Sequence, residues 1–324
     1  MKLFMIGATG YVGSVVAERL KADGHDITGL ARSADAAAQL AAAGIEPVRG
    51  AMGDRDVLGE HATKADGVVQ IATGGFLVQA LETVNEAVST VDTFLEALAG
   101  TDKPYVLTGG TGAYLDTGIA FPERVVTEAD PISPPHFYSH LGDILRKVAA
   151  TENVRTIVPA LGQVYGRAGG YIGPVARLFN GVRKHGVVHA VAPGTNAFTF
   201  VHVDDAADLY ALALRRTDTR GTFIAATDTV PAIDVARAVS TAAGLGGEVE
   251  FVDYPTMREL NGRVGELDFF VNCRASSQKA RDVLGWQPHR PGVIAELASL
   301  PTPLDLNAVY PEPKRQLAAS RVNF

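Results

Sequence analysis

The stretch Gly7-Ala8-Thr9-Gly10-Tyr11-Val12-Gly13 decides the fold, because it spaces three glycines between an apolar run at 2–6 and a helical pattern at 11–23. So tight a turn from strand to helix needs residues without a Cβ. Gly10 lets backbone amides approach a pyrophosphate, Gly13 lets the helix pack on the sheet, and the helix N-terminus offers further donors to the anion. The motif predicts a dinucleotide-binding loop, and the alternative is a plain glycine-rich turn.

The rest of the first half alternates short β-rich runs with helical patterns. Such alternation is typical of a parallel sheet covered by helices on both faces, and continuous apolar runs fit strands buried on both sides. The predicted strands are 2–6, 26–31, 45–48, 67–71, 104–108 and 155–159, and the predicted helices are 11–23, 34–43, 55–60, 77–99 and 136–151. The pattern predicts the α/β class, with a Rossmann-like doubly wound parallel sheet.

The regular alternation stops after residue 160. A glycine-rich loop follows at 162–173, and the chain then reads as a strand at 198–203, a helix at 204–215, a strand at 222–226 and a helix at 233–243. This change of organisation indicates a second, smaller unit in the C-terminal half.

Composition and charge exclude several classes of function. The chain of 324 residues carries 29 Lys and Arg against 36 Asp and Glu, a formal net charge of −7, whereas a nucleic-acid binder needs a basic face. Its one cysteine, Cys273, excludes a disulfide framework and a zinc site of several cysteines, and no metal site is predicted. No targeting segment or run of 18 apolar residues is seen, so we expect a cytoplasmic protein without a membrane partner.

The residues after the second predicted strand select the nucleotide. About 20 positions beyond the glycines an acidic residue would bind a ribose diol. This chain has Arg32 and Ser33 there instead. A guanidinium can bind a 2′-phosphate through two hydrogen bonds, and the hydroxyl can add a donor. The pattern favours NADP over NAD, and the alternative is a solvated arginine at a helix start.

Five pieces of the chain, in order, resemble the extended or atypical branch of the short-chain dehydrogenase/reductase superfamily, the NAD-dependent epimerase/dehydratase-like group. They are the glycine motif, Gly-Leu-Ala-Arg-Ser at 29–33, Val-Tyr-Gly at 164–166, Phe-Val-His-Val-Asp-Asp at 200–205 and Leu-Gly-Trp-Gln-Pro at 284–288. The resemblance implies an NAD(P)-binding Rossmann-like domain at 1–160 and a mainly substrate-binding domain at 161–324, with 198–226 returning to the first. It also implies a small-molecule substrate and a homodimer through the helices at 77–99 and 136–151.

The resemblance extends the expected cofactor site beyond the glycine motif. It implies that the backbone at 159–162 approaches the nicotinamide and that the backbone at 71–73 lines the adenosine and ribose side. The expected cofactor contacts are Gly7, Thr9, Gly10, Tyr11, Val12, Gly13, Arg32, Ser33, Ile71, Ala72, Thr73, Pro159 and Leu161.

The catalytic positions depart from the family pattern, which uses a tyrosine, a lysine four residues later, and a serine or threonine after the fifth strand. Tyr138 stands at the tyrosine position, but Gly142 replaces the lysine and Gly110 the serine. The helical neighbours of Tyr138 offer no substitute cation. We expect Tyr138 to act as the acid, with the hydroxyl of Thr111 or Thr108 binding a substrate oxygen.

Other charged residues are expected to have structural roles. Asp204 or Asp205 should cap the helix that follows, with His202 held by hydrogen bonds, because this set lacks the spacing of a metal site. Arg167 and Arg177 could meet an anionic substrate, although solvated arginines are the commoner outcome.

Three functions follow as alternatives. The first is an NADP(H)-dependent oxidoreductase acting on a small carbonyl or alcohol. The second is a redox-neutral epimerase, dehydratase or cyclase that retains its nucleotide. The third is a nucleotide-binding regulator without catalysis, which the missing lysine and serine favour.

Overall fold

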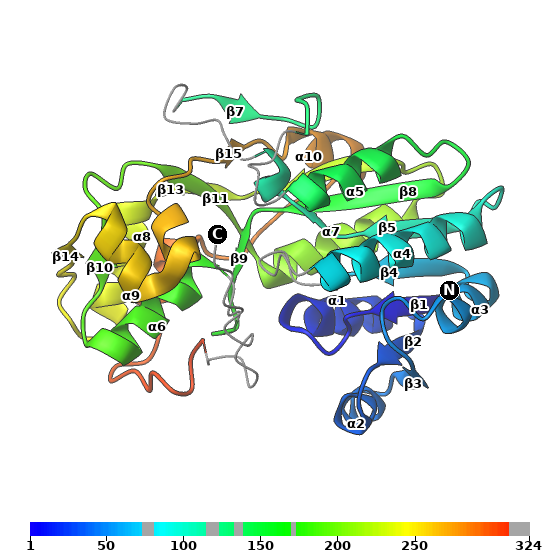
Figure 1. Cartoon of the computed structure of the whole chain (residues 1–324), viewed down its shortest axis with the longest axis horizontal. Coiled ribbons are helices and arrows are strands. Elements are labelled where there is room, and N and C mark those ends of the chain that lie inside the picture. Colours follow the sequence, from blue (N-terminus) through cyan, green and yellow to red (C-terminus); the bar gives the residue numbers. More distant parts are fainter. Residues whose placement is uncertain (73–80, 115–122, 133–138, 170–172, 311–324) are drawn as a thin grey trace.

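A parallel sheet forms the centre of the computed structural model, which describes residues 1–72, 81–114, 123–132, 139–169 and 173–310 (Figure 1). Seven strands lie in the order β12-β8-β5-β4-β1-β2-β3, and β6 also pairs with β8. Every pairing within this sheet is parallel. The strands are β1 Lys2–Ile6, β2 Asp26–Ala31, β3 Glu46–Arg49, β4 Gly67–Gln70, β5 Pro104–Leu107, β6 Gly109–Gly110, β8 Arg155–Leu161 and β12 Gly221–Ala225. The predicted α/β class is confirmed.

The first strand shows why helices must cover both faces of this sheet. Successive side chains of a strand point to opposite faces. Leu3 and Met5 accordingly lie in one hydrophobic cluster, and Phe4 and Ile6 lie in another. Since all four side chains are at most 2% exposed, each face of the sheet needs its own cover.

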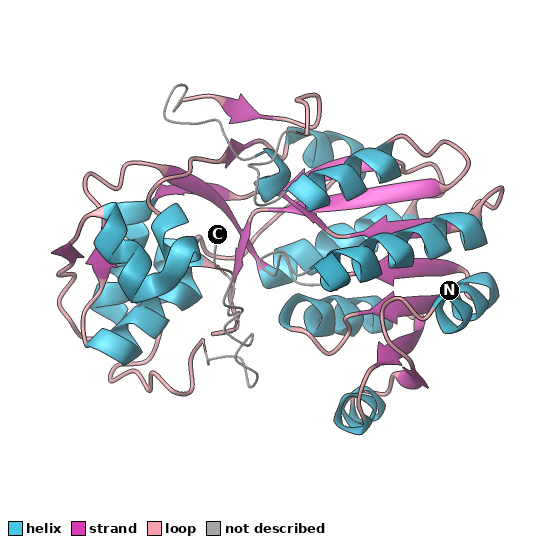
Figure 2. Cartoon of the chain, in the orientation of Figure 1, coloured by secondary structure: helices cyan, strands magenta, loops and turns pink. Residues whose placement is uncertain are grey.

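Helices supply this cover on both faces (Figure 2). The first cluster is closed by residues of α1 Tyr11–Ala22, α2 Ala34–Ala42, α7 Val203–Arg215 and α10 Gln278–Leu284. The second is closed by residues of α3 Arg55–Lys64, α4 Leu81–Leu98 and α5 Ser139–Ala149. The sheet is therefore doubly wound.

A smaller unit lies beside the carboxyl edge of the sheet and has its own hydrophobic cluster (Figure 1). Its strands are β9 Gln163–Tyr165, β10 His189–Ala190, β11 Ala197–His202, β13 Asp228–Pro231 and β14 Glu250–Phe251. Its helices are α6 Pro174–His185, α8 Ala232–Ala242, α9 Tyr254–Leu267 and α11 Val293–Ala298. The strands β13, β11 and β9 form a three-stranded sheet, and β10 pairs with β14.

The segment 198–226 crosses between the two units. Its last strand, β12, joins the main sheet beside β8, and α7 packs along α1. Its first strand, β11, stays in the small sheet between β9 and β13. A further ladder joins the short strands β7 Val125–Val126 and β15 Arg274–Ala275.

Element bounds differ from the sequence prediction mainly at their ends. β8 continues two residues beyond 159, because β6 and β12 both keep pairing with it as far as Leu161. The helices expected at 77–99 and 136–151 begin outside the described residues, and their described parts are α4 and α5. Within the part of the chain that the structure describes, no helix is both long enough and apolar enough to cross a membrane.

Candidate functional site

The glycine-rich turn joins the end of β1 to α1 at the carboxyl edge of the main sheet. Gly7 has a φ of +93°, and a Cβ there would lie 2.7 Å from the backbone nitrogen of Ala72. A Cβ on Gly13 would overlap the carbonyl oxygen of Gly7. Gly10 begins α1 without a side-chain cap, and the first turn of α1 has no acidic residue. The amides at this helix start therefore suit an anion such as a pyrophosphate.

The neighbouring segments close around this turn. The backbone amides of Ile71 and Ala72 both donate to the carbonyl of Ile6, over 2.9 and 3.2 Å. On the other side, the side-chain amide of Gln39 in α2 donates to the carbonyl of Thr9 over 3.4 Å. The turn is thus braced between β4 and α2.

The other residues expected at the cofactor site differ in burial. Val12 is partly buried and packs against the first hydrophobic cluster. Pro159 and Leu161 are buried within β8, where they pair with Phe223 and Ala225 of β12. Thr73 lies outside the described residues.

Tyr11 ties the glycine motif to the second unit. Its hydroxyl donates to the carbonyl of Gly166 over 2.8 Å, and its ring leaves no room for a Cβ on Gly169. Burial raises the pKa of Tyr11 far above its ordinary value, so the phenol keeps the proton that it donates. The same loop accepts a 2.7 Å hydrogen bond at the carbonyl of Ala168 from the backbone of Tyr310. The loop 166–169 therefore connects the glycine-rich turn with the C-terminal segment.

The end of β2 carries the residues expected to select the nucleotide. Arg32 is exposed there, and Ser33 is the N-cap of α2, accepting a 3.1 Å hydrogen bond from the amide of Ala36. The Ser33 hydroxyl keeps its own proton to donate. The sequence reasoning did not include Arg49, which ends β3 and donates from Nη2 to the carbonyl of Arg32 over 3.5 Å. In the sequence, the feature that could have indicated Arg49 is an arginine at the end of the strand that follows 26–31.

The tyrosine position and its missing lysine fall at the start of α5. Tyr138 lies outside the described residues. Gly142, at the lysine position, is buried in α5. The Arg and Lys of this helix form ion pairs with carboxylates: Arg146 binds Asp143, and Lys147 binds a carboxylate of α4.

The two candidate hydroxyls are both buried. The Thr108 hydroxyl is buried and lies 2.6 Å from the hydroxyl of Tyr210. Thr111 lies in the 3-10 helix η1 Thr111–Tyr114, and its side chain forms a hydrogen bond with the thiol of Cys273. Its carbonyl accepts from Cys273 over 3.5 Å, and burial raises the pKa of that thiol to about 11, which makes it a poor nucleophile.

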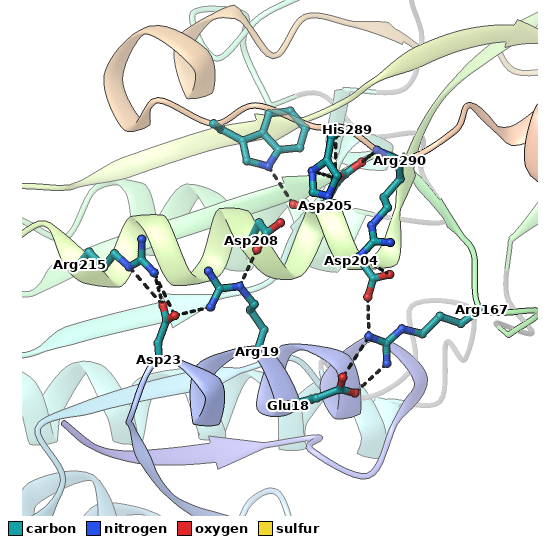
Figure 3. Close-up of polar contacts among 11 residues, drawn as sticks. Glu18, Arg19, Asp23, Arg167, Asp204, Asp205, Asp208, Arg215, His289 and Arg290 are labelled. Atoms are coloured by element: carbon teal, nitrogen blue, oxygen red, sulfur yellow. Dashed lines mark hydrogen bonds and ion pairs between the residues drawn. The ribbon is translucent and has the colours of Figure 1, made fainter.

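The prediction that Asp204 or Asp205 caps α7 is wrong, because His202 is the cap. Its Nδ1 accepts a 3.2 Å hydrogen bond from the amide of Asp204. The carboxylate of Asp205 is instead taken by the amides of His289 and Arg290, each at 3.1 Å (Figure 3). A buried carboxylate needs donors, and a segment more than 80 residues away supplies them.

Arg167 and Arg177 are held by carboxylates, so neither is simply solvated. Arg167 pairs with Glu18 of α1 over 2.7 Å and with Asp204 of α7 over 2.6 Å (Figure 3). Arg177 pairs with the buried Asp268 through Nε over 2.6 Å. These arginines join structural elements.

One group of side chains in Figure 3 has atoms close enough for metal ligation. Donor atoms of Asp205, Asp208 and His289 lie within 4.8 Å of one another. The two amides described above satisfy Asp205, and Arg19 binds Asp208 over 2.5 Å. Hydrogen bonds and an ion pair thus account for this group.

The His202 cap predicts a pH dependence of stability. Burial lowers the pKa of His202, so the folded chain binds this proton less readily than the unfolded chain, whose histidine pKa is about 6.5. As the pH falls below about 6.5, the unfolded state gains the proton first, and the free energy of unfolding should fall by at most about 1.4 kcal/mol per pH unit from this group. His202→Asn retains a capping side chain without the titration and should flatten the slope.

Urea unfolding of both proteins between pH 5 and 8 measures this difference. The pKa values of His25, His140 and His189 are also lowered by burial, so the variant should keep part of the slope. Identical slopes in the two proteins would show that His202 does not contribute.

Three comparisons with known proteins complete the description. The sequence model of the NAD dependent epimerase/dehydratase family matches residues 3–226. The chain is 30% identical over 322 residues to the uncharacterized protein YLL056C of Saccharomyces cerevisiae, covering 92% of this chain and 98% of that protein. The human epimerase family protein SDR39U1, solved with NADPH, has a TM-score of 0.70 at 19% identity, covering 92% and 97% of the two chains. DesIV of Streptomyces venezuelae, a dTDP-glucose 4,6-dehydratase solved with NAD and TYD, has a TM-score of 0.73 at 17% identity, covering 92% and 96%.

Proposed function

The chain belongs to the NAD-dependent epimerase/dehydratase family, and we propose that it is an NADP(H)-dependent oxidoreductase acting on a small carbonyl or alcohol. The observation that carries the proposal is the turn at 7–13, where Gly7 and Gly13 leave no room for a side chain, with Arg32 at the end of the adjacent strand. Such a turn lets the backbone approach a pyrophosphate closely, and an arginine at the position that selects the nucleotide suits a 2′-phosphate. Together these two features fit a phosphorylated dinucleotide.

The residues present fit a nicotinamide dinucleotide. The open helix start of α1 would hold the pyrophosphate, the backbone at Ile71 and Ala72 would line the adenosine side, and Arg32 with Ser33 would face the 2′-phosphate. SDR39U1, which shares the fold, was solved with NADPH. When bound, the nicotinamide supplies or accepts hydride, and the chain supplies orientation and the proton.

The proposed acid, Tyr138, would act without the lysine of the family pattern. A tyrosine phenol has an ordinary pKa of about 10, and Gly142 supplies no cation to lower it. Tyr138 would act as the acid and donate its proton to a carbonyl oxygen. The Thr111 hydroxyl would donate a second hydrogen bond to that oxygen. The chain would in this way supply the proton that reduction of a carbonyl consumes.

A fluorescence titration with NADPH and NADH tests the cofactor part of the proposal. NADPH should bind more tightly, and NADPH should then be consumed in the presence of suitable aldehydes or ketones. Tighter binding of NADH would remove the assignment of Arg32. Turnover without net consumption would indicate redox-neutral chemistry, and binding of neither nucleotide would favour a regulator.

Tyr138→Phe is expected to lower kcat by about 100-fold, because a general acid contributes at least that factor. The dissociation constant of NADPH should stay within a factor of two, since the proton is needed only in the chemical step. Steady-state kinetics and the same fluorescence titration measure the two quantities. An unchanged kcat would exclude Tyr138 as the acid.

The two threonines provide the matched comparison. Thr111→Val should lower kcat by about tenfold through the loss of one hydrogen bond to the substrate oxygen. Thr108→Val should lower stability by removing the bond to Tyr210 while leaving kcat nearly unchanged. The reverse pattern would assign the substrate hydroxyl to Thr108.

A further inference from the structure

The ends of β2 and β3 place two arginines side by side. The parallel register sets Ala31 opposite Arg49, and the amide of Gly50 donates to the carbonyl of Ala31 over 3.2 Å. The guanidinium of Arg49 reaches back to the carbonyl of Arg32 over 3.5 Å. The backbone pairing therefore holds Arg49 against the residue expected to select the nucleotide.

The pair lacks the carboxylate partners that half of the described arginines have. Nine described arginines form ion pairs with carboxylates: Arg19, Arg55, Arg124, Arg146, Arg167, Arg177, Arg215, Arg216 and Arg290. Arg32 and Arg49 make no ion pair with any described residue, and both are exposed. The acidic residue nearest to Arg32 in sequence, Asp35, lies in the first turn of α2 and binds neither of them. Two unneutralised guanidinium groups at one sheet edge form a local positive site in a chain of net charge −7.

We propose that Arg49 is a specificity-determining residue that binds the 2′-phosphate of NADP(H) together with Arg32. This inference rests on the proposed NADP(H) function and adds a second ligand to it. A phosphate monoester carries between one and two negative charges at neutral pH, so two guanidinium groups from neighbouring strands match its charge. Each can donate charge-assisted hydrogen bonds to phosphate oxygens. The ribose diol of NAD offers no such charge.

Arg49→Gln should weaken NADPH binding by about tenfold, the loss expected for a charge-assisted hydrogen bond, and should leave NADH binding within a factor of two. The dissociation constants are measured by fluorescence titration for the wild type, Arg32→Gln, Arg49→Gln and the double variant. Because the two arginines share one phosphate, the double variant should deviate from additivity. Raising the salt concentration should weaken NADPH binding more in the wild type than in the double variant.

Arg237→Gln is the matched control, because it removes one exposed arginine from α8 in the second unit and changes the net charge equally. Its affinities for both nucleotides should equal those of the wild type. Competition by 2′,5′-ADP and by ADP provides a second probe, because only the former carries the 2′-phosphate. Arg49→Gln should reduce competition by 2′,5′-ADP alone.

The outcomes separate this inference from the proposed function. If the wild type prefers NADPH and Arg32→Gln removes the preference while Arg49→Gln does not, the role of Arg49 is overturned and the function stands. If the wild type does not prefer NADPH, both are overturned. If Arg49→Gln weakened the binding of NADPH and of NADH equally, Arg49 would only support the end of the strand. That result would also overturn the inference.

Discussion

Gly13→Ala is expected to abolish measurable NADPH binding and to lower the free energy of unfolding by about 3 kcal/mol or more. The added methyl group would overlap the carbonyl oxygen of Gly7, which is backbone and has no rotamer to escape into. Only a shift of α1 away from β1 could relieve the overlap, and that shift would move the amides that we propose bind the pyrophosphate. Thermal or urea unfolding and NADPH titration measure the two effects.

Gly59→Ala is the control for this substitution. Gly59 lies in α3, and a Cβ there would meet nothing closer than 3.7 Å from the side chain of Thr93. Since alanine favours a helix over glycine by up to about 1 kcal/mol, this variant should be as stable as the wild type or more so. NADPH binding by Gly13→Ala at wild-type strength would refute the close approach at the turn.

Asp205→Ala is expected to lower the free energy of unfolding by about 3–5 kcal/mol, because two hydrogen bonds to a charged group are lost at once. The carboxylate is 1% exposed and accepts from the amides of His289 and Arg290. Its backbone carbonyl also accepts from the indole of Trp286 over 2.8 Å. That bond to the backbone remains in the variant, so the loss of stability measured by urea unfolding should come from the contacts of residues 289 and 290 with α7.

Two further variants serve as controls for Asp205→Ala. Asp208→Ala removes another carboxylate from α7. The side chain of Asp208 is 31% exposed and pairs with Arg19, so its loss should lower the free energy of unfolding by about 1 kcal/mol or less. Asp205→Asn retains an oxygen acceptor and should fall between the two. A loss in Asp205→Ala no larger than in Asp208→Ala would mean that these amides do not depend on the carboxylate.

The sequence was sufficient for features that depend on residues close together in the chain. Glycine spacing, apolar strands and helical periodicity placed the cofactor turn and most elements, because a tight turn and a strand buried on both faces restrict the local residue types. Even there, β8 ran on to Leu161 because its neighbours continued to pair with it. The family resemblance supplied the catalytic positions, of which Tyr138 lies outside the described residues.

The tertiary structure decided which distant side chains meet. His202 rather than an aspartate caps α7, since the amides at 289 and 290 take Asp205. The hydroxyl of Thr108 lies 2.6 Å from that of Tyr210, which is 102 residues away in the chain. Arg49 lies beside Arg32 because β2 and β3 pair in one register, 17 residues apart in the chain. Such contacts follow from strand pairing and from the need of buried polar groups for partners, and neither leaves a periodic signal in the sequence.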